Sequence, residues 1–322
     1  MKIYIFITIL LIVLSFLYFK LAIKFKIIDK PNQRSSHTKI TVRGGGIIFP
    51  ISILLFFISN DYQYSYFILG VVLISIVSFL DDMYTLSSKV RFPFQLLAVF
   101  LVLVQLNTFS LPFYLPMIFL FLGLAIINMF NFMDGVNGIT GFYSLIVISS
   151  FYILNLSENL ISDDLFIYSI ISIIIFCFYN FRKKALFFGG DIGSISIGLL
   201  LFFIGLYYTI NFKSPLFLLT VIVYGADAGN TLIYRKLFTE ESIFEPHRHH
   251  LYQKLVDFKI FSHLQVSLVY GLIQLIVNLI LLQFYKTTLF IQWTLFFGLI
   301  FCFILFYIFS FKKLKLIKSN LS

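Results

Sequence analysis

Long apolar stretches separated by short polar segments make up most of this chain. Eleven stretches have about the length of a membrane-spanning helix, roughly 20 residues. They lie near residues 3–23, 44–59, 64–80, 93–109, 113–130, 139–156, 165–181, 193–211, 215–234, 264–285 and 289–311. The pattern predicts an all-α integral membrane protein, a polytopic bundle of about eleven transmembrane helices, with ten as the alternative count.

Composition agrees with this prediction. The 322 residues are 60% hydrophobic and 12% charged, with a mean hydropathy of +0.99, which excludes an ordinary soluble protein. The first stretch lacks a small-residue cleavage site, so we expect it to stay as a helix. A single polytopic domain, residues 1–322, is expected, with cytoplasmic loops near 24–43, 81–92, 131–138, 182–192 and 235–263.

The basic residues divide sharply between the two sets of loops. Of 24 Lys and Arg, 21 fall in alternate loops and the C-terminal tail, and only Lys2, Lys213 and Lys286 fall in the other set. By the positive-inside rule, the rich set is cytoplasmic, the N-terminus lies outside and the C-terminus inside. The net charge of +10 follows from this topology and forms no continuous stripe, so no nucleic-acid partner is expected.

The first polar cluster on the expected cytoplasmic side is the loop DKPNQRSSHTKITVRGGG. Arg43 offers positive charge, while Gly44 and Gly45 let backbone N–H groups approach a phosphate. This pattern favours phosphate binding. The alternative is an ordinary basic loop with a flexible entry into the second span.

A second cluster, DDMYTLSSKVR, follows the third span. The adjacent carboxylates of Asp81 and Asp82 repel each other and therefore favour a cation or a basic partner. The alternative is a solvated helix end, satisfied by Lys89 and Arg91.

A third cluster, NMFNFMDG, closes the fifth span, and its Asn128, Asn131 and Asp134 recur every three residues on one rough helix face. Polar groups this close to hydrocarbon usually face a cavity or a partner. Bonding between helices is the alternative.

The fourth cluster is FFGGDIGS, in which Asp191 stands between glycines just before the eighth span. A carboxylate in such a loop is suited to Mg²⁺, with the following helix N-terminus receiving phosphate oxygens. The alternative is a simple helix cap. No thiolate metal site competes with this interpretation, because Cys177 and Cys302 lie in separate apolar runs.

The fifth cluster is EPHRHHLYQK, after the ninth span. His247, Arg248 and His250 favour an oligophosphate over zinc, because the histidine spacing gives no standard zinc ligand set. A basic membrane-surface loop is the alternative. Asp227 lies within the ninth span, where it either binds substrate or makes a helix-packing hydrogen bond.

Taken in order, the strings DD-x₃-L-S, N-x₂-N-F-M-D-G, G-D-x-G-S and H-R-x-H-x-Y-Q resemble the polyprenyl-phosphate N-acetylhexosamine-1-phosphate transferase family. The resemblance runs from Asp29 to Gln253. The run DAGNTLIYR, with Asp227, is most similar to members that initiate O-antigen synthesis. Ser88 and Val42 depart from prolines that are common in the family.

The resemblance implies catalytic roles for Asp81, Asp82 and Asp134, and an Mg²⁺ ligand in Asp191, with Mn²⁺ as an alternative ion. Asn131 is implied in the active site, and the phosphate-handling loop is implied for the group His247, Arg248 and His250.

The implied reaction takes place at the cytoplasmic face of a bacterial inner membrane. It transfers an N-acetylaminosugar 1-phosphate from a UDP-sugar to undecaprenyl phosphate and releases UMP. The donor is UDP-GlcNAc or a related 6-deoxy sugar such as FucNAc or QuiNAc, and a homodimer is left open. A transporter of an anionic solute is the main alternative, but it predicts polar residues toward both faces. A structural subunit leaves the acidic clusters unexplained.

Overall fold

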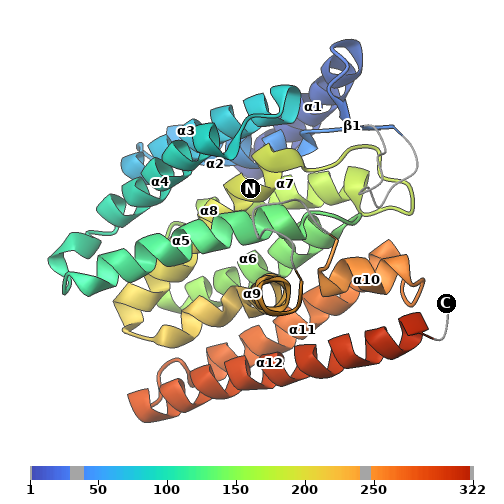
Figure 1. Ribbon diagram of the computed structural model, residues 1–322. Coiled ribbons are helices and arrows are strands. Elements are labelled where there is room, and N and C mark those ends of the chain that lie inside the picture. The colour runs from blue at the N-terminus through green and yellow to red at the C-terminus, as the bar shows by residue number, and fades with distance from the viewer. Residues whose placement is uncertain (1, 30–39, 240–247, 320–322) are drawn as a thin grey trace.

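The computed structural model describes residues 2–29, 40–239 and 248–319. It is an all-helical bundle apart from one pair of two-residue strands, as the sequence predicts (Figure 1). The elements are α1 Lys2–Lys24, β1 Ile28–Asp29, β2 Thr41–Val42, η1 Gly45–Ile47, α2 Ile48–Ser59, α3 Ser65–Tyr84, α4 Ser88–Gln105, η2 Thr108–Ser110, α5 Tyr114–Met133, α6 Ile139–Glu158, α7 Asp163–Asn180, α8 Gly190–Phe212, η3 Pro215–Val221, α9 Ile222–Phe238, α10 Leu251–Asp257, α11 His263–Phe284 and α12 Leu289–Ser319.

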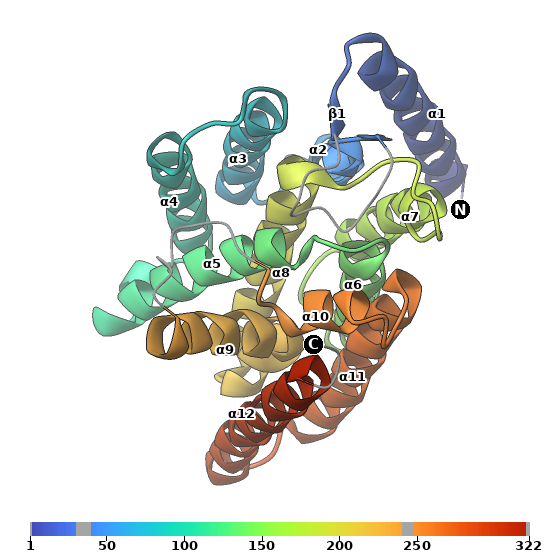
Figure 2. The ribbon, with the colours of Figure 1, turned by 45° about the vertical axis from the view of Figure 1, so that its right-hand side comes forward.

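Helix α8 is the centre of the bundle. Every residue from Ile192 to Leu206 is buried, because α3 and α5 pack along it and α2 and α6 cover its remaining sides (Figure 2). An apolar helix buried all round needs no polar stripe, which is why this segment contains only Ile, Leu and Phe with small Gly and Ser residues. At the rim, α12 exposes large side chains such as Phe290 and Phe309, as expected for a surface that contacts hydrocarbon.

Within the described residues, ten helices are long and apolar enough to cross a membrane, and Gly45–Ser59 is a shorter eleventh apolar element. The chain from Gly45 to Tyr64 nevertheless extends along most of α8. Its first residues pair with the start of α8, where the Gly46 amide donates to the Gly189 carbonyl at 2.9 Å. By Tyr64 the chain has reached the other end, where the ring of Tyr64 lies 6.3 Å from that of Tyr207. All eleven predicted stretches are therefore helical, and one of them is short.

Two faces of the bundle can be distinguished by their contacts. We call the end that carries the start of α8 the proximal face, and the other end the distal face. At the distal face, Ser162 donates to Asn60 at 3.1 Å, and Glu158 binds Lys286 at 2.7 Å. In Figure 1, β1, α10 and the last turns of α12 lie at the right of the bundle, and the α4–α5 and α11–α12 connections lie at its left. The orientation of these faces in the membrane stays a prediction from the charge pattern.

The described parts of the proximal loops contain short secondary-structure elements. The first contains the antiparallel pair β1–β2, with Ile28 opposite Val42 and Asp29 opposite Thr41. The last contains the helix α10. The expected loop at 182–192 ends earlier, because α8 begins at Gly190, so Asp191 lies in the first turn of that helix and not before it.

The ninth span changes from one helix type to another inside the bundle. It starts as the 3₁₀ helix η3 and becomes α-helical at Ile222. Next to this change, the Val223 amide donates to the Gln274 side chain of α11 at 3.1 Å. Gln274 also accepts from the Tyr143 hydroxyl at 2.6 Å. Such satisfied bonds between helices are what make an irregular backbone tolerable at membrane depth.

Candidate active site

Backbone contacts between glycines join the start of α2 to the start of α8. The Gly45 amide donates to the Phe188 carbonyl at 2.8 Å, and Gly46 donates to Gly189. A Cβ on Gly46 would lie 2.3 Å from the Gly193 Cα, so the two backbones touch. The amides of Gly45 and Gly46 therefore hold the two helix starts together. The predicted phosphate-binding role of Gly44 and Gly45 stays untested.

Asp82 caps α8 from the last turn of α3. Its carboxylate accepts the backbone N–H groups of Asp191 at 2.9 Å and Ile192 at 3.2 Å. Gly190 has φ +71° and a Cβ there would lie 2.3 Å from Asp82 Oδ2, so the position requires glycine. A carboxylate at a helix N-terminus satisfies orphan donors and matches the helix dipole. Asp82 is therefore the residue that caps α8, and the side chain of Asp191 is not needed for capping.

Two arginines bridge three carboxylates at the proximal face. Arg43 contacts Asp82 through Nε at 2.7 Å and Asp191 through Nη2 at 3.0 Å. Arg91 contacts Asp81 at 2.7 Å and Asp191 at 3.0 Å, both through Nη1. We call Asp81, Asp82 and Asp191 the acidic centre. The neighbouring carboxylates raise the pKa of Arg43 despite its burial, so its charge is permanent.

The acidic centre has the donor chemistry of a magnesium site. Its ligands are carboxylate oxygens, and three carboxylates facing two guanidinium groups leave one negative charge uncompensated. Within the described ranges, no group of three His, Cys, Asp or Glu side chains is already arranged around one point. Mg²⁺ does not need such a cage, since it commonly takes one or two protein carboxylates together with substrate phosphates. The residues therefore fit Mg²⁺ bound jointly with an anionic substrate.

Asp134 lies directly beyond α5, next to the acidic centre. Its Oδ1 accepts from the Thr140 hydroxyl at 2.6 Å, and a Cβ on Gly189 would lie 2.9 Å from its Oδ2. Burial raises the pKa of Asp134 to about 6, with the Asp191 charge acting in the same direction and Thr140 and Arg43 opposing it. Asn131, one turn earlier, lies close to the carboxylate of Asp191. Both residues thus lie beside the acidic centre, and the roles that the resemblance implies for them stay predictions.

Asp227 forms a second buried cluster, completely shielded from solvent. Its carboxylate accepts the backbone amides of Leu251 at 3.0 Å and Tyr252 at 3.1 Å, the hydroxyl of Tyr270 at 2.6 Å, and contacts His250 Nδ1 at 3.2 Å. These contacts anchor the start of α10. Asp227 and His250 therefore have a structural task here, and direct roles for them in binding or catalysis stay predictions.

The Asp227 cluster is connected to the acidic centre by one side chain. Tyr252 donates its hydroxyl to the Phe132 carbonyl at 3.0 Å, two residues before Asp134. Arg248 lies at the surface and forms a two-point ion pair with Asp257. His247 lies outside the described residues. The fifth cluster therefore contacts the region beside the acidic centre through α10.

Some contacts in the structure differ from those that the sequence predicts. Asn128 donates to Gln95 of α4 at 3.1 Å, so it makes a bond between helices and does not join Asn131 and Asp134. The sequence suggests Arg91 only as a counterion of the acidic pair. In the structure Arg91 forms ion pairs with two carboxylates. Tyr18, which donates to the Arg43 carbonyl at 2.6 Å, carries no signal in the sequence, because it looks like one more aromatic residue of an apolar helix.

Comparison with known proteins gives matches that include the segment carrying this site. The model of glycosyl transferase family 4 matches residues 64–209, the segment that contains the acidic centre, Asn131 and Asp134. A Bacillus subtilis protein described as a probable undecaprenyl-phosphate N-acetylglucosaminyl 1-phosphate transferase is 27% identical over 78% of this chain and 75% of its own length. The undecaprenyl-phosphate alpha-N-acetylglucosaminyl 1-phosphate transferases of Yersinia pestis (28%, over 74% and 71%) and Escherichia coli K12 (27%, over 78% and 75%) are also similar.

Fold, acidic centre and relatives together define a polytopic membrane transferase of the phospho-sugar class. Within this class the chain is similar to the polyprenyl-phosphate N-acetylhexosamine-1-phosphate transferases, as the motifs also indicate.

Proposed function

We propose that this protein transfers N-acetylglucosamine 1-phosphate, or a closely related N-acetylaminosugar 1-phosphate, from its UDP derivative to undecaprenyl phosphate. The observation that carries the proposal is the acidic centre, in which Arg43 and Arg91 bridge three carboxylates at one face of a membrane bundle. The names of the three relatives support the acceptor and favour GlcNAc over the 6-deoxy sugars. The product would initiate a cell-envelope polysaccharide on the cytoplasmic side.

In the proposed reaction, an oxygen of the acceptor phosphate forms a bond to the β-phosphorus of the UDP-sugar. The bond from that phosphorus to the bridging oxygen breaks, and UMP leaves with the oxygen. A phosphate monoester is already largely dianionic near neutral pH, so the protein does not need a strong base to deprotonate the acceptor. Positioning and charge stabilisation carry most of such a transfer.

The residues of the chain divide these tasks. Arg43 and Arg91, whose side chains are 30% and 26% exposed, present positive charge to both anionic substrates. Asp191, with Asp81 beside it, would hold Mg²⁺, which supplies further charge neutralisation when bound. Asp82 keeps the start of α8 in place through its two amide contacts.

A direct assay tests the proposal. Purified protein, UDP-GlcNAc, undecaprenyl phosphate and MgCl₂ should yield UMP and a lipid whose mass has increased by one N-acetylhexosamine phosphate. Omission of the acceptor or addition of EDTA should abolish both products. UDP-glucose serves as a matched donor without the N-acetyl group, and UDP-FucNAc and UDP-QuiNAc test the alternative sugars. No acceptor-dependent UMP release with any of these N-acetylated donors would contradict the proposal.

The pKa of Asp134 gives a prediction on pH. Because burial raises this pKa to about 6, the carboxyl group is protonated below that pH and ionised above it. If the ionised form is needed, kcat/KM should fall as the pH drops through about 6. Asp134→Asn should lower activity and remove this limb. Thr140→Val should move the limb to higher pH, since the Thr140 hydroxyl stabilises the carboxylate. An acid limb unchanged in both variants would exclude Asp134 as its source.

A further inference from the structure

A cavity of about 500 Å³ lies between α9, α10, α11 and α12, and none of the acidic-centre residues lines it. Its walls are almost entirely apolar and include Leu255 of α10, Ile273 of α11 and Phe303 and Phe306 of α12. The volume is within the range of ligand-binding cavities, about 300–1,000 Å³. None of the residues that have a task in the proposed transfer lines this cavity.

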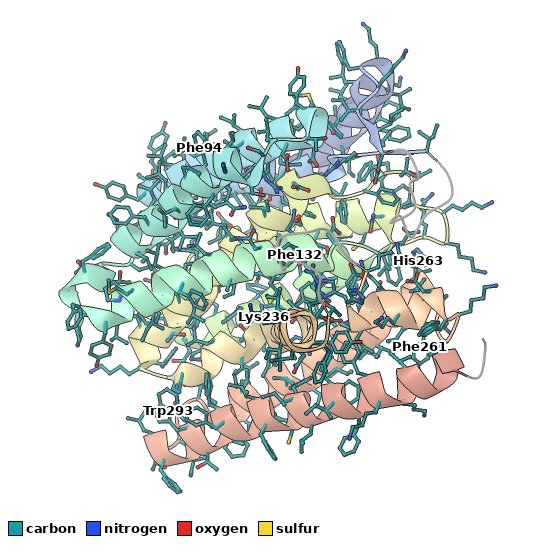
Figure 3. The ribbon with its side chains drawn as sticks, in the orientation of Figure 1. Phe94, Phe132, Lys236, Phe261, His263 and Trp293 are labelled. Atoms are coloured by element: carbon teal, nitrogen blue, oxygen red, sulfur yellow. The ribbon has the colours of Figure 1, made fainter. Side chains whose placement is uncertain are left out.

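The residues that line the cavity change in character along α12. From Phe303 to Lys313, α12 rises about 15 Å toward the proximal face. The residues at the deep end are aromatic or aliphatic, while Ser310 and Lys313 line the proximal end. Figure 3 shows Phe261, another lining residue, at this end of the molecule and Trp293 at the far end of α12. The cavity therefore combines a hydrocarbon interior with a cation near the membrane surface.

We propose that this cavity binds one acyl chain of an anionic glycerophospholipid, with the lipid phosphate paired to Lys313. Its chain lies against Ile273 and Phe303. A water-soluble anion gains nothing from the apolar walls, and a neutral lipid gains nothing from the lysine. Basic positions between transmembrane helices near the cytoplasmic surface are the usual sites for anionic headgroups. Lysine at this depth extends its ammonium group to the interface, where a headgroup phosphate lies.

The cavity shares a wall with the Asp227 cluster. Leu251 and Tyr270 line it, and both also bind Asp227, the first through its amide and the second through its hydroxyl. A bound acyl chain therefore supports the start of α10 from below. The same helix carries Tyr252, which contacts the Phe132 carbonyl beside Asp134. Lipid occupancy should accordingly stabilise the proximal face, and this step alone rests on the proposed function.

Native mass spectrometry of the full chain, delipidated in detergent and titrated with phosphatidylglycerol or phosphatidylcholine, tests the binding without any sugar donor. We expect a phosphatidylglycerol adduct that Lys313→Gln weakens about fivefold, the loss expected for one interfacial cation. Lys312→Gln is the matched control, because Lys312 is exposed and does not line the cavity. Equal retention of phosphatidylcholine, or no difference between the two lysine variants, would overturn the proposal.

A second pair of variants tests the cavity itself. Ile273→Trp should fill it and remove the adduct, whereas Ile276→Trp, on the outward side of the same helix with 60% exposure, should leave binding intact. Turnover is then compared in vesicles of phosphatidylcholine alone and with one-third phosphatidylglycerol. We expect a severalfold gain for the wild-type chain and for Lys312→Gln, and none for Lys313→Gln. An adduct that persists in folded Ile273→Trp excludes this cavity, and an unchanged rate excludes the coupling. Loss of all turnover with intact lipid binding would instead count against the transfer function.

Discussion

Asp191→Asn should reduce transfer at least about a hundredfold, the scale seen when one group that stabilises transition-state charge is removed. The substitution keeps the shape of the side chain but removes the negative charge between Arg43 and Arg91. Each arginine retains a second carboxylate at 2.7 Å, Asp82 for Arg43 and Asp81 for Arg91. The fold should therefore survive, with a melting temperature close to that of the wild type.

The measurement is acceptor-dependent UMP release at several Mg²⁺ concentrations, together with thermal unfolding. Asp164→Asn is the matched control, since Asp164 lies in the first turn of α7 and accepts a hydrogen bond from Tyr4 at the distal face. It should retain wild-type turnover. Normal turnover by folded Asp191→Asn would remove the proposed metal role.

Asp227→Ala should be the most destabilising single change at the proximal face. It leaves two backbone amides, a tyrosine hydroxyl and His250 without their buried acceptor. Removal of one partner from a buried charged cluster typically costs about 3–5 kcal/mol of the free energy of unfolding. Asp227→Asn should cost less, because it keeps one acceptor oxygen in place.

Thermal unfolding in detergent and limited proteolysis between α9 and α11 report this effect. Asp257→Ala is the control, because the pair it forms with Arg248 is partly exposed and worth only about 0–1 kcal/mol. If Asp227→Ala lowers activity while the protein stays as stable as the wild type, the buried cluster has no anchoring role, and direct substrate binding becomes the better explanation.

The sequence predicts the helices of this protein well because membrane burial is a local property. Each of the eleven apolar stretches becomes a helix, and the charge pattern separates the loops of the two faces. Helix ends are less predictable: Asp191 looks like a loop residue, yet it lies inside α8, since Asp82 supplies the cap from a helix more than a hundred residues away.

The contacts that build the site are long-range, and no periodicity encodes them. Arg43 and Asp191 are 148 residues apart in the chain, and Arg91 and Asp191 are 100 apart. The motifs identify which side chains carry chemistry, but not that two arginines bridge the three carboxylates. Nor does hydropathy reveal that Asp227 organises α10, because the sequence does not show that this buried aspartate has five hydrogen-bonding partners.

The contact between Gly46 and Gly193 limits how enzymes of this architecture diversify. Where two backbones touch, no mutation can add a side chain without separating α2 from α8, and with them Arg43 and Asp191. The main chain therefore fixes the spacing of the charged groups. Adaptation to a different sugar has to proceed through side chains farther from this contact, so divergence in donor choice can accumulate while the chemistry of phosphate transfer remains fixed.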